Sequence, residues 1–264
     1  MEKNQQKEKI YIFHIFRSDG QSLFLHPLSN PDKLVAQLEN TEVIGRYGRE
    51  PRVEALTLFR NELYRQIETG VKRWLADIRF IPKFLISATV FIITYFFLSF
   101  VIRDPIPLID EIAISLGVSV VLFYLLSRRD ISSEKAAKKR LVLRSAVDKI
   151  TFRQSPFVQQ VEKILHQNES SSINEVIRQI LEPIEQQLSE SQKEEADHFI
   201  QLLEGKFNFR RIKRKERQFQ RYLKGSGDKS QHIHKLGKAR KLDFPLYAVY
   251  KSLKKITPNA KSQR

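Results

Sequence analysis

The sequence contains no cysteine, which excludes disulfide bonds and thiolate metal sites. It also lacks the spacings of a phosphate-binding loop, a dinucleotide glycine motif, a serine nucleophile elbow and a zinc-protease helix. His232 and His234 are two residues apart, but no acidic cluster accompanies them, so the pair is a poor candidate for a metal site. We therefore expect a protein that is not an enzyme and that has no metal and no cofactor.

The N-terminus lacks a long hydrophobic run. Residues 10–16 form an apolar stretch of only seven residues that includes His14, and no small-residue cleavage site follows closely. This stretch is too short for the core of a signal peptide. We expect the N-terminus to be retained.

Long apolar stretches are confined to one block. Residues 84–102 carry no charge, and as a helix they would span roughly 28 Å, close to the hydrocarbon thickness of a bilayer of about 30 Å. A second apolar stretch, residues 106–126, follows after a link too short to hold a domain. The pattern predicts a two-span transmembrane helical hairpin.

Two carboxylates interrupt the second stretch near its start, at Asp110 and Glu111. Carboxylates within a membrane are costly and often mark an ion or proton path. We favour the simpler interpretation that both lie about one turn inside the outer interface, where they reach water or pair with Arg103.

Positive charges flank the hairpin unevenly. Ten Lys and Arg residues lie on the two flanks that lead to the chain ends, whereas the tip has only Arg103. Because Lys and Arg are enriched in cytoplasmic loops, we expect a multi-pass protein of the cell (inner) membrane with both termini in the cytoplasm.

Shorter elements are expected before the hairpin. Residues 9–16 and 21–26 surround an Asp-Gly turn signal and predict a β-hairpin. A helix over 31–39 follows, with Asn30 as its cap, and then a loop over 40–50. A long helix is expected from Pro51, with an apolar stripe at three- and four-residue steps: Val53, Leu56, Phe59, Leu63, Ile67, Val71 and Leu75.

Helices are expected to dominate the region after the hairpin. The pattern predicts them over 132–150, 155–167 and 173–204, the last with a bend at Pro183. In the first of these, the apolar side is expected to comprise Leu141, Val142, Ala146 and Val147. A further helix over 244–256 follows Asp243, which can cap it.

The predicted fold class is mostly α, with a two-span transmembrane helical hairpin, a cytoplasmic helical module and a small N-terminal β-hairpin. We expect four parts: a cytoplasmic N-terminal part (1–79), the hairpin (80–129), a cytoplasmic helical part (130–205) and a strongly basic amphipathic tail (206–264).

The net charge of +16 belongs entirely to the tail. Residues 206–264 carry 19 Lys and Arg against 3 Asp and Glu, whereas residues 1–205 carry 27 of each sign. The densest stretch is 207–224, and its cations are the candidate binding residues for an anionic partner: Arg210, Arg211, Lys213, Arg214, Lys215, Arg217, Arg221 and Lys224. We call these eight residues the basic segment.

Three interpretations of the basic segment compete. It could bind the anionic cytoplasmic leaflet, with about 1 kcal/mol gained per cation near the surface. It could bind RNA, with Phe207, Phe209 or Tyr222 stacking on bases. It could also be a solvated helix face that the acidic residues of 182–204 partly neutralise.

The expected function is a non-enzymatic integral membrane anchor or scaffold whose basic tail binds lipid headgroups, RNA or an acidic protein. The alternative is one subunit of an oligomeric channel or transporter complex, in which copies of Asp110 and Glu111 would ring the outer mouth. Assembly into a homo-oligomer is compatible with both, and no small-molecule substrate is expected.

Overall fold

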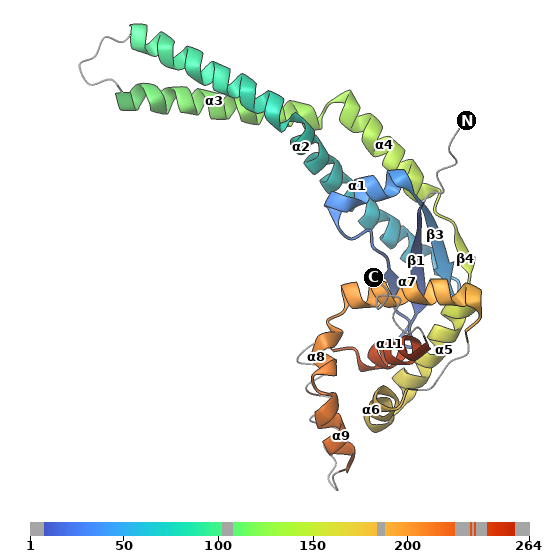
Figure 1. Cartoon of the computed structure of the whole chain (residues 1–264). Helices are drawn as coiled ribbons and strands as arrows, with labels where there is room; N and C mark the ends of the chain where they lie inside the picture. The colour runs from blue at the N-terminus through green and yellow to red at the C-terminus, as the bar shows by residue number, and fades with distance from the viewer. Residues whose placement is uncertain are drawn as a thin grey trace. The chain divides into compact units, whose positions relative to one another are not determined.

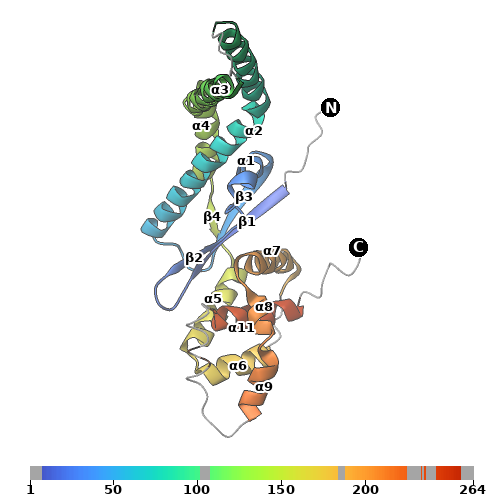
Figure 2. The same cartoon turned by 90° about the vertical axis from the view of Figure 1, so that its left-hand side faces the viewer.

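The computed structural model describes residues 8–101, 108–183, 188–224, 233, 235 and 242–256. Among these residues the protein is mostly helical, with 75% helix and a small sheet of four strands. Figure 1 and Figure 2 show the helices and the sheet in two views. It divides into two compact units. Unit 1 comprises Met1–Pro27, Thr41–Phe59 and Ile150–Arg264, and unit 2 comprises Leu28–Asn40 and Arg60–Lys149.

The sheet in unit 1 has the strand order β2-β1-β3-β4. Strand β1 (Glu8–Phe16) pairs antiparallel with β2 (Ser22–Leu25), which confirms the predicted β-hairpin. The other edge of β1 pairs in parallel with β3 (Thr41–Tyr47), and β3 pairs in parallel with β4 (Phe152–Gln154).

The loop predicted over 40–50 was therefore wrong for its first part, which forms β3. Gly45 was read as a loop residue, but it lies where β3 meets β4. A Cβ at this position would lie 2.6 Å from the Phe152 ring, so the close approach of these strands needs glycine.

Strand β1 lies between two neighbours and is covered on both faces. Its side chains from Tyr11 to Phe16 are all buried, as expected for a strand that is apolar on both faces. On one face the ring of Phe13 makes edge contacts with Phe157 and Phe199, at centroid distances of 6.3 and 5.2 Å. These contacts join the sheet to the helical core of unit 1.

The helices of unit 1 are α5 (Pro156–Ser170), α6 (Ile173–Leu181), α7 (Glu190–Lys206), α8 (Phe209–Lys213), α9 (Glu216–Lys224) and α11 (Phe244–Ile256). The single helix predicted over 173–204 was wrong, because α6 ends at Leu181 and α7 begins at Glu190. The residue before a proline avoids the helical conformation, so Pro183 ends the helix instead of bending it. The cap predicted at Asp243 is confirmed: its Oδ1 accepts a hydrogen bond from the Leu246 N–H at 3.0 Å.

Unit 2 contains α1 (Pro31–Asn40), most of α2 (Val53–Val101), α3 (Leu108–Ile131) and α4 (Glu134–Asp148). The predicted cap of α1 is confirmed, since the side chain of Asn30 accepts a hydrogen bond from the Asp32 N–H at 3.0 Å. The apolar stripe of α2 is buried at Phe59 and at Leu63, Ile67, Val71 and Leu75. It was wrong at Val53, whose side chain is 79% exposed at the start of the helix.

Helices α2 and α3 are long and apolar enough to cross a membrane, within Val53–Phe100 and Ile109–Ile131. They run antiparallel, because Ser119 Oγ donates a hydrogen bond to the Ser87 carbonyl at 2.9 Å and Ser99 Oγ donates to Glu111 Oε2 at 2.6 Å. Small and polar side chains lie buried between the helices, among them Ser115, while large apolar side chains are exposed around the pair. Small residues allow two helices to approach closely.

Asp130 on α3 holds together the end of this helix pair that is nearer to α4. It forms ion pairs with Arg79 and with Lys83 on α2, the latter at 3.5 Å. Two of the cations that flank the hairpin are thus partly neutralised. The apolar side predicted for 132–150 is confirmed at Val147, which is buried, but was wrong at Leu141 and Val142, which are 72% and 55% exposed. Leu143 is buried instead.

Candidate anionic-partner surface

The basic segment forms two short helices joined at Arg214 and Lys215. Helix α8 carries Arg210, Arg211 and Lys213, and α9 carries Arg217, Arg221 and Lys224. The Lys215 carbonyl accepts hydrogen bonds from the N–H groups of Gln218 and Phe219 and so begins α9. All eight predicted cations therefore lie within one short stretch of backbone.

Apolar side chains of both helices face the core of unit 1. Phe209, Ile212 and Phe219 are buried, and the ring of Phe219 packs edge-on against Phe244 of α11 at 5.9 Å. Because these side chains occupy the inner face, the cations are left on the outer face. Seven of the eight are exposed, and Lys215 is half-buried.

None of the eight cations forms an ion pair with any residue that the structure describes. The one carboxylate within α8 and α9 is Glu216, and it is engaged elsewhere. It accepts a hydrogen bond from the Tyr247 hydroxyl at 2.6 Å and pairs with Lys251 at 3.2 Å. No described carboxylate therefore neutralises the positive charge of the basic segment.

The acidic stretch 182–204 could have neutralised the basic segment, but the described carboxylates that pair do so with other groups. Glu195 pairs with Arg46 at 2.8 Å, and Glu204 pairs with Lys254 at 2.9 Å. Within the described ranges no carboxylate of α7 pairs with α8 or α9. The interpretation as a partly neutralised helix face therefore gains no support from these residues.

The aromatic side chains offered for base stacking take part in the fold. Phe209 is buried against Tyr247 and Tyr250, at centroid distances of 5.1 and 5.0 Å. Phe207 stacks on Phe209 at 5.6 Å, and both Phe207 and Tyr222 pack against the core. Of these three rings, Phe209 is the most buried and therefore the least accessible to an outside partner.

Tyr247, Tyr250 and Glu204, beside the basic segment, were missed by sequence reasoning. The Tyr250 hydroxyl donates a hydrogen bond to Glu204 at 2.6 Å, and Lys254 Nζ lies 2.9 Å from both groups. Burial raises the pKa of Tyr250, and its bond to Glu204 raises that pKa further. The local signal was weak, because 244–256 reads as an ordinary amphipathic helix.

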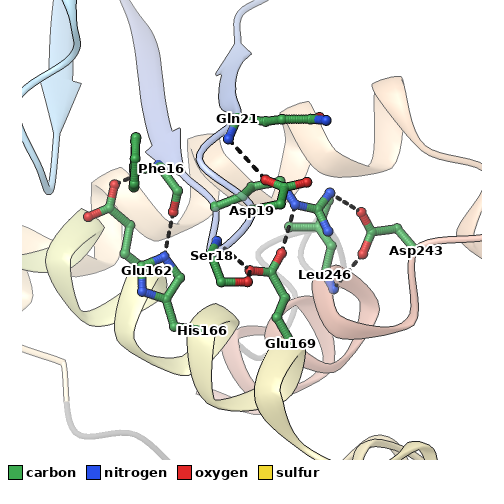
Figure 3. Close-up of polar contacts among 10 residues, drawn as sticks. Phe16, Ser18, Asp19, Gln21, Glu162, His166, Glu169, Asp243 and Leu246 are labelled. Carbon is green, nitrogen blue, oxygen red and sulfur yellow. Dashed lines mark hydrogen bonds and ion pairs between the residues drawn. The ribbon is translucent and has the colours of Figure 1, made fainter.

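A second polar cluster joins the turn between β1 and β2 to α5 and α11 (Figure 3). Arg17 pairs with Glu169 at 2.7 Å and with Asp243 at 2.6 Å. Glu162 accepts a hydrogen bond from the Phe16 N–H at 2.8 Å, and His166 Nε2 lies 2.7 Å from the Phe16 carbonyl oxygen. The cluster explains how the sheet is attached to the helices.

Glu162 is the buried carboxylate of this cluster. Burial raises its pKa, and hydrogen bonds from the backbone N–H groups of Phe16 and Arg49 lower it in part. Gly48 lies against the same carboxylate, where a Cβ atom would collide with it. Donors of the protein itself surround Glu162, so we assign it a structural role.

The histidines that the structure describes do not gather into a ligand set. His14 is fully buried in β1, with Nε2 3.0 Å from Ser22 Oγ, and burial lowers its pKa to about 4. His26 contacts the Phe59 ring edge-on at 5.2 Å. His232 and His234 lie outside the described residues. Within the described ranges, no group of three or more histidine or acidic side chains could hold a metal ion.

The two carboxylates of the second apolar stretch have different surroundings. Asp110 is exposed, whereas Glu111 is buried and accepts the hydrogen bond from Ser99. Arg103, the partner that the sequence suggested, lies outside the described residues. Glu111 therefore faces the neighbouring helix of its own hairpin.

No protein-family model matches the chain, and comparison with curated proteins and with solved structures finds no match. Its function has to be inferred from the residues described above.

Proposed function

We propose that this protein is a non-enzymatic membrane anchor whose basic segment binds anionic lipid headgroups. In this proposal the hairpin 84–102 and 106–126 crosses the cell membrane, and both termini lie in the cytoplasm. The observation that carries the proposal is that all eight cations lack an acidic partner among the described residues, while the apolar side chains beside them are buried.

The surface of the hairpin supports its place in a bilayer. Large apolar side chains point outward from both helices, as those of Phe96, Phe97 and Leu116 do, while polar ones lie between the helices. A helix pair in water would bury the first group and expose the second. The flanking excess of Lys and Arg supports the cytoplasmic placement of both ends.

The aromatic side chains beside the cations favour lipid over RNA as the partner, because they pack against the protein's own core. Binding to single strands usually combines cations with free aromatic rings that stack on bases. Here Phe209 is buried, and Phe207 and Tyr222 pack against the core. The rings here are buried (Phe209) or half-buried (Phe207 and Tyr222), so they form no row of free stacking platforms for successive bases. Such a cationic surface suits an anionic headgroup layer, to which each Lys or Arg contributes about 1 kcal/mol.

The channel alternative gains less support. A polar pathway would need carboxylates that face away from their own hairpin. Asp110 is exposed, but Glu111 is hydrogen-bonded to Ser99 within the hairpin. Two helices enclose no pathway, so this alternative also requires several copies. A strict monomer in detergent would exclude the homomeric version.

Orientation can be tested without background because the chain has no cysteine. Single cysteines introduced by Ser18→Cys and by Asp104→Cys would each be the sole thiol. In intact cells a membrane-impermeant maleimide should label the second variant and spare the first. Labelling of Ser18→Cys from outside would refute the cytoplasmic placement of the N-terminal part.

Lipid binding can be tested with the full chain in nanodiscs of neutral lipid. Its binding to vesicles with and without phosphatidylserine, and to a short single-stranded RNA, would be measured across a salt series. A variant with four exposed cations of the basic segment replaced by glutamine should bind anionic vesicles up to about a thousandfold more weakly, since about 1 kcal/mol is lost per cation and about 1.4 kcal/mol is tenfold in affinity. The four positions are Arg211, Arg214, Arg217 and Arg221.

The matched control removes the same charge elsewhere on the protein. It replaces four exposed cations by glutamine: Lys72, Lys149, Arg153 and Lys163. The control should bind almost as well as the unaltered protein. Equal losses in both variants would show that only net charge matters, and tighter binding to RNA than to anionic vesicles would identify RNA as the partner. Either result would overturn the proposal.

A further inference from the structure

A cavity opens beside the basic segment, between the end of α7, helix α8 and helix α11. Its volume is about 250 Å³. Arg210 and Lys213 line it from α8, and Lys254 lines it from α11. Glu204 contributes the one carboxylate among its walls. The cavity therefore carries a local excess of two positive charges.

The carboxylate does not neutralise the two cations of α8. Glu204 is bound to Lys254 at 2.9 Å and to the Tyr250 hydroxyl at 2.6 Å. Arg210 and Lys213 are exposed and form no ion pair with any described residue. Their donors remain available to a group that enters the cavity.

Aromatic side chains form another part of the wall. Phe207 lines the cavity, and its ring is held in place by stacking on Phe209 at 5.6 Å with 10° between the planes. Phe209 is buried against Tyr247 and Tyr250. The ring of Phe207 is therefore supported from within and presents a fixed apolar surface.

We propose that this cavity binds a phosphate monoester carried on a small ring, with the phosphate on Arg210 and Lys213 and the ring against Phe207. The inference rests on the proposed function and deepens it, because it names the group that two cations of the basic segment recognise. It goes beyond the sequence, which led us to expect no small-molecule ligand.

Charge and shape select this class of ligand. A phosphate monoester carries about −1.5 to −2 charges near pH 7, which matches the local excess. The planar guanidinium of arginine can donate two parallel hydrogen bonds to phosphate oxygens. The volume lies somewhat below the range of drug-sized pockets, roughly 300–1,000 Å³, so it suits one phosphorylated ring rather than a polymer.

The full chain in neutral nanodiscs would be titrated with inorganic phosphate, AMP and inositol 1-phosphate by calorimetry. A lipid arm would compare vesicles containing phosphatidylinositol 4-phosphate with phosphatidylserine vesicles of equal charge. We expect at least one phosphorylated ring to bind saturably, with one site per chain, and about tenfold more tightly than inorganic phosphate. Preference for the soluble probes identifies a free ligand, and preference confined to the phosphoinositide vesicles identifies a lipid headgroup.

Two variants separate the cavity from general charge. Arg210→Gln with Lys213→Gln should weaken ring-phosphate binding about tenfold or more. Arg217→Gln with Arg221→Gln removes the same charge from α9, outside the cavity, and should change the affinity for the soluble probes AMP and inositol 1-phosphate less than about twofold, although it weakens binding to anionic vesicles. Phe207→Leu should bring the affinity for AMP or inositol phosphate down to that for inorganic phosphate.

Two results would overturn the inference while leaving the proposed function intact. In the first, anionic vesicles bind, but no phosphorylated ring is preferred over inorganic phosphate or over phosphatidylserine. In the second, the α9 pair of substitutions weakens ring-phosphate binding as much as the α8 pair does. Conversely, a soluble probe could bind saturably while anionic vesicles do not bind at all. That result would contradict the lipid proposal and would still support the cavity as a ring-phosphate site.

Discussion

Replacing His14 with glutamine should make the protein less sensitive to acid. His14 is fully buried in β1, beside the ring of Phe24 at 4.9 Å and 3.0 Å from Ser22 Oγ. Burial lowers its pKa from the ordinary value of 6.5 to about 4. The folded state therefore holds this side chain neutral at a pH where the unfolded chain protonates it.

The size of the effect follows from this shift. Because the folded pKa lies below the unfolded one, the contribution of neutral His14 is complete above about pH 6.5 and is lost as the pH falls toward 4. The lowering of the His14 pKa from 6.5 to about 4 corresponds to about 3 kcal/mol, of which about 2 kcal/mol is lost by about pH 5. That loss corresponds to a fall in Tm of roughly 4–8 °C for a unit of this size.

The assay is thermal unfolding of the full chain in detergent at about pH 7.5 and about pH 5, followed by circular dichroism. Glutamine does not titrate and can still bond to Ser22, so the Tm of His14→Gln should fall by roughly 4–8 °C less than that of the unaltered protein. His14→Asn serves as a second replacement that does not titrate. If both variants lose Tm in parallel with the unaltered protein, His14 is not the group that acid protonates.

Two further substitutions probe the attachment of the sheet. Gly48→Ala should destabilise unit 1 by about 1–3 kcal/mol, because the added Cβ would collide with the Glu162 carboxylate. An unchanged Tm at neutral pH would contradict this packing. Arg17→Met keeps the apolar stem but leaves Glu169 and Asp243 without their shared cation. We expect a loss of about 1–3 kcal/mol and faster amide exchange in the β1–β2 turn, and unchanged exchange would refute the role given to Arg17.

Elements that depend on neighbouring residues could be predicted well. The β1–β2 hairpin, α1 with its Asn30 cap and α11 with its Asp243 cap were all expected from short patterns. The strands β3 and β4 could not be predicted in this way. Strand β4 pairs with residues more than 100 positions away, and its three residues carry little pattern of their own. Gly45 looked like a loop signal until its contact with Phe152 explained it.

The candidate site was predictable in composition and not in arrangement. The eight cations stood out by their density, whereas the burial of Phe209 against two tyrosines of α11 did not. The pairing of Glu204 with Lys254 and of Glu216 with Lys251 required the fold. Ion pairs between helices depend on distances that no local pattern encodes.

The sequence by itself determined the apolar helix pair, the confinement of net charge to 206–264 and the absence of thiol chemistry, because these are properties of composition and of neighbouring residues. Only the tertiary structure decided which charges are paired and which remain free. It placed the carboxylates of α7 on Arg46 and Lys254, and it packed Phe209 against two tyrosines of α11. The physical reason is that burial and ion pairing depend on separation in space, which folding sets independently of separation along the chain.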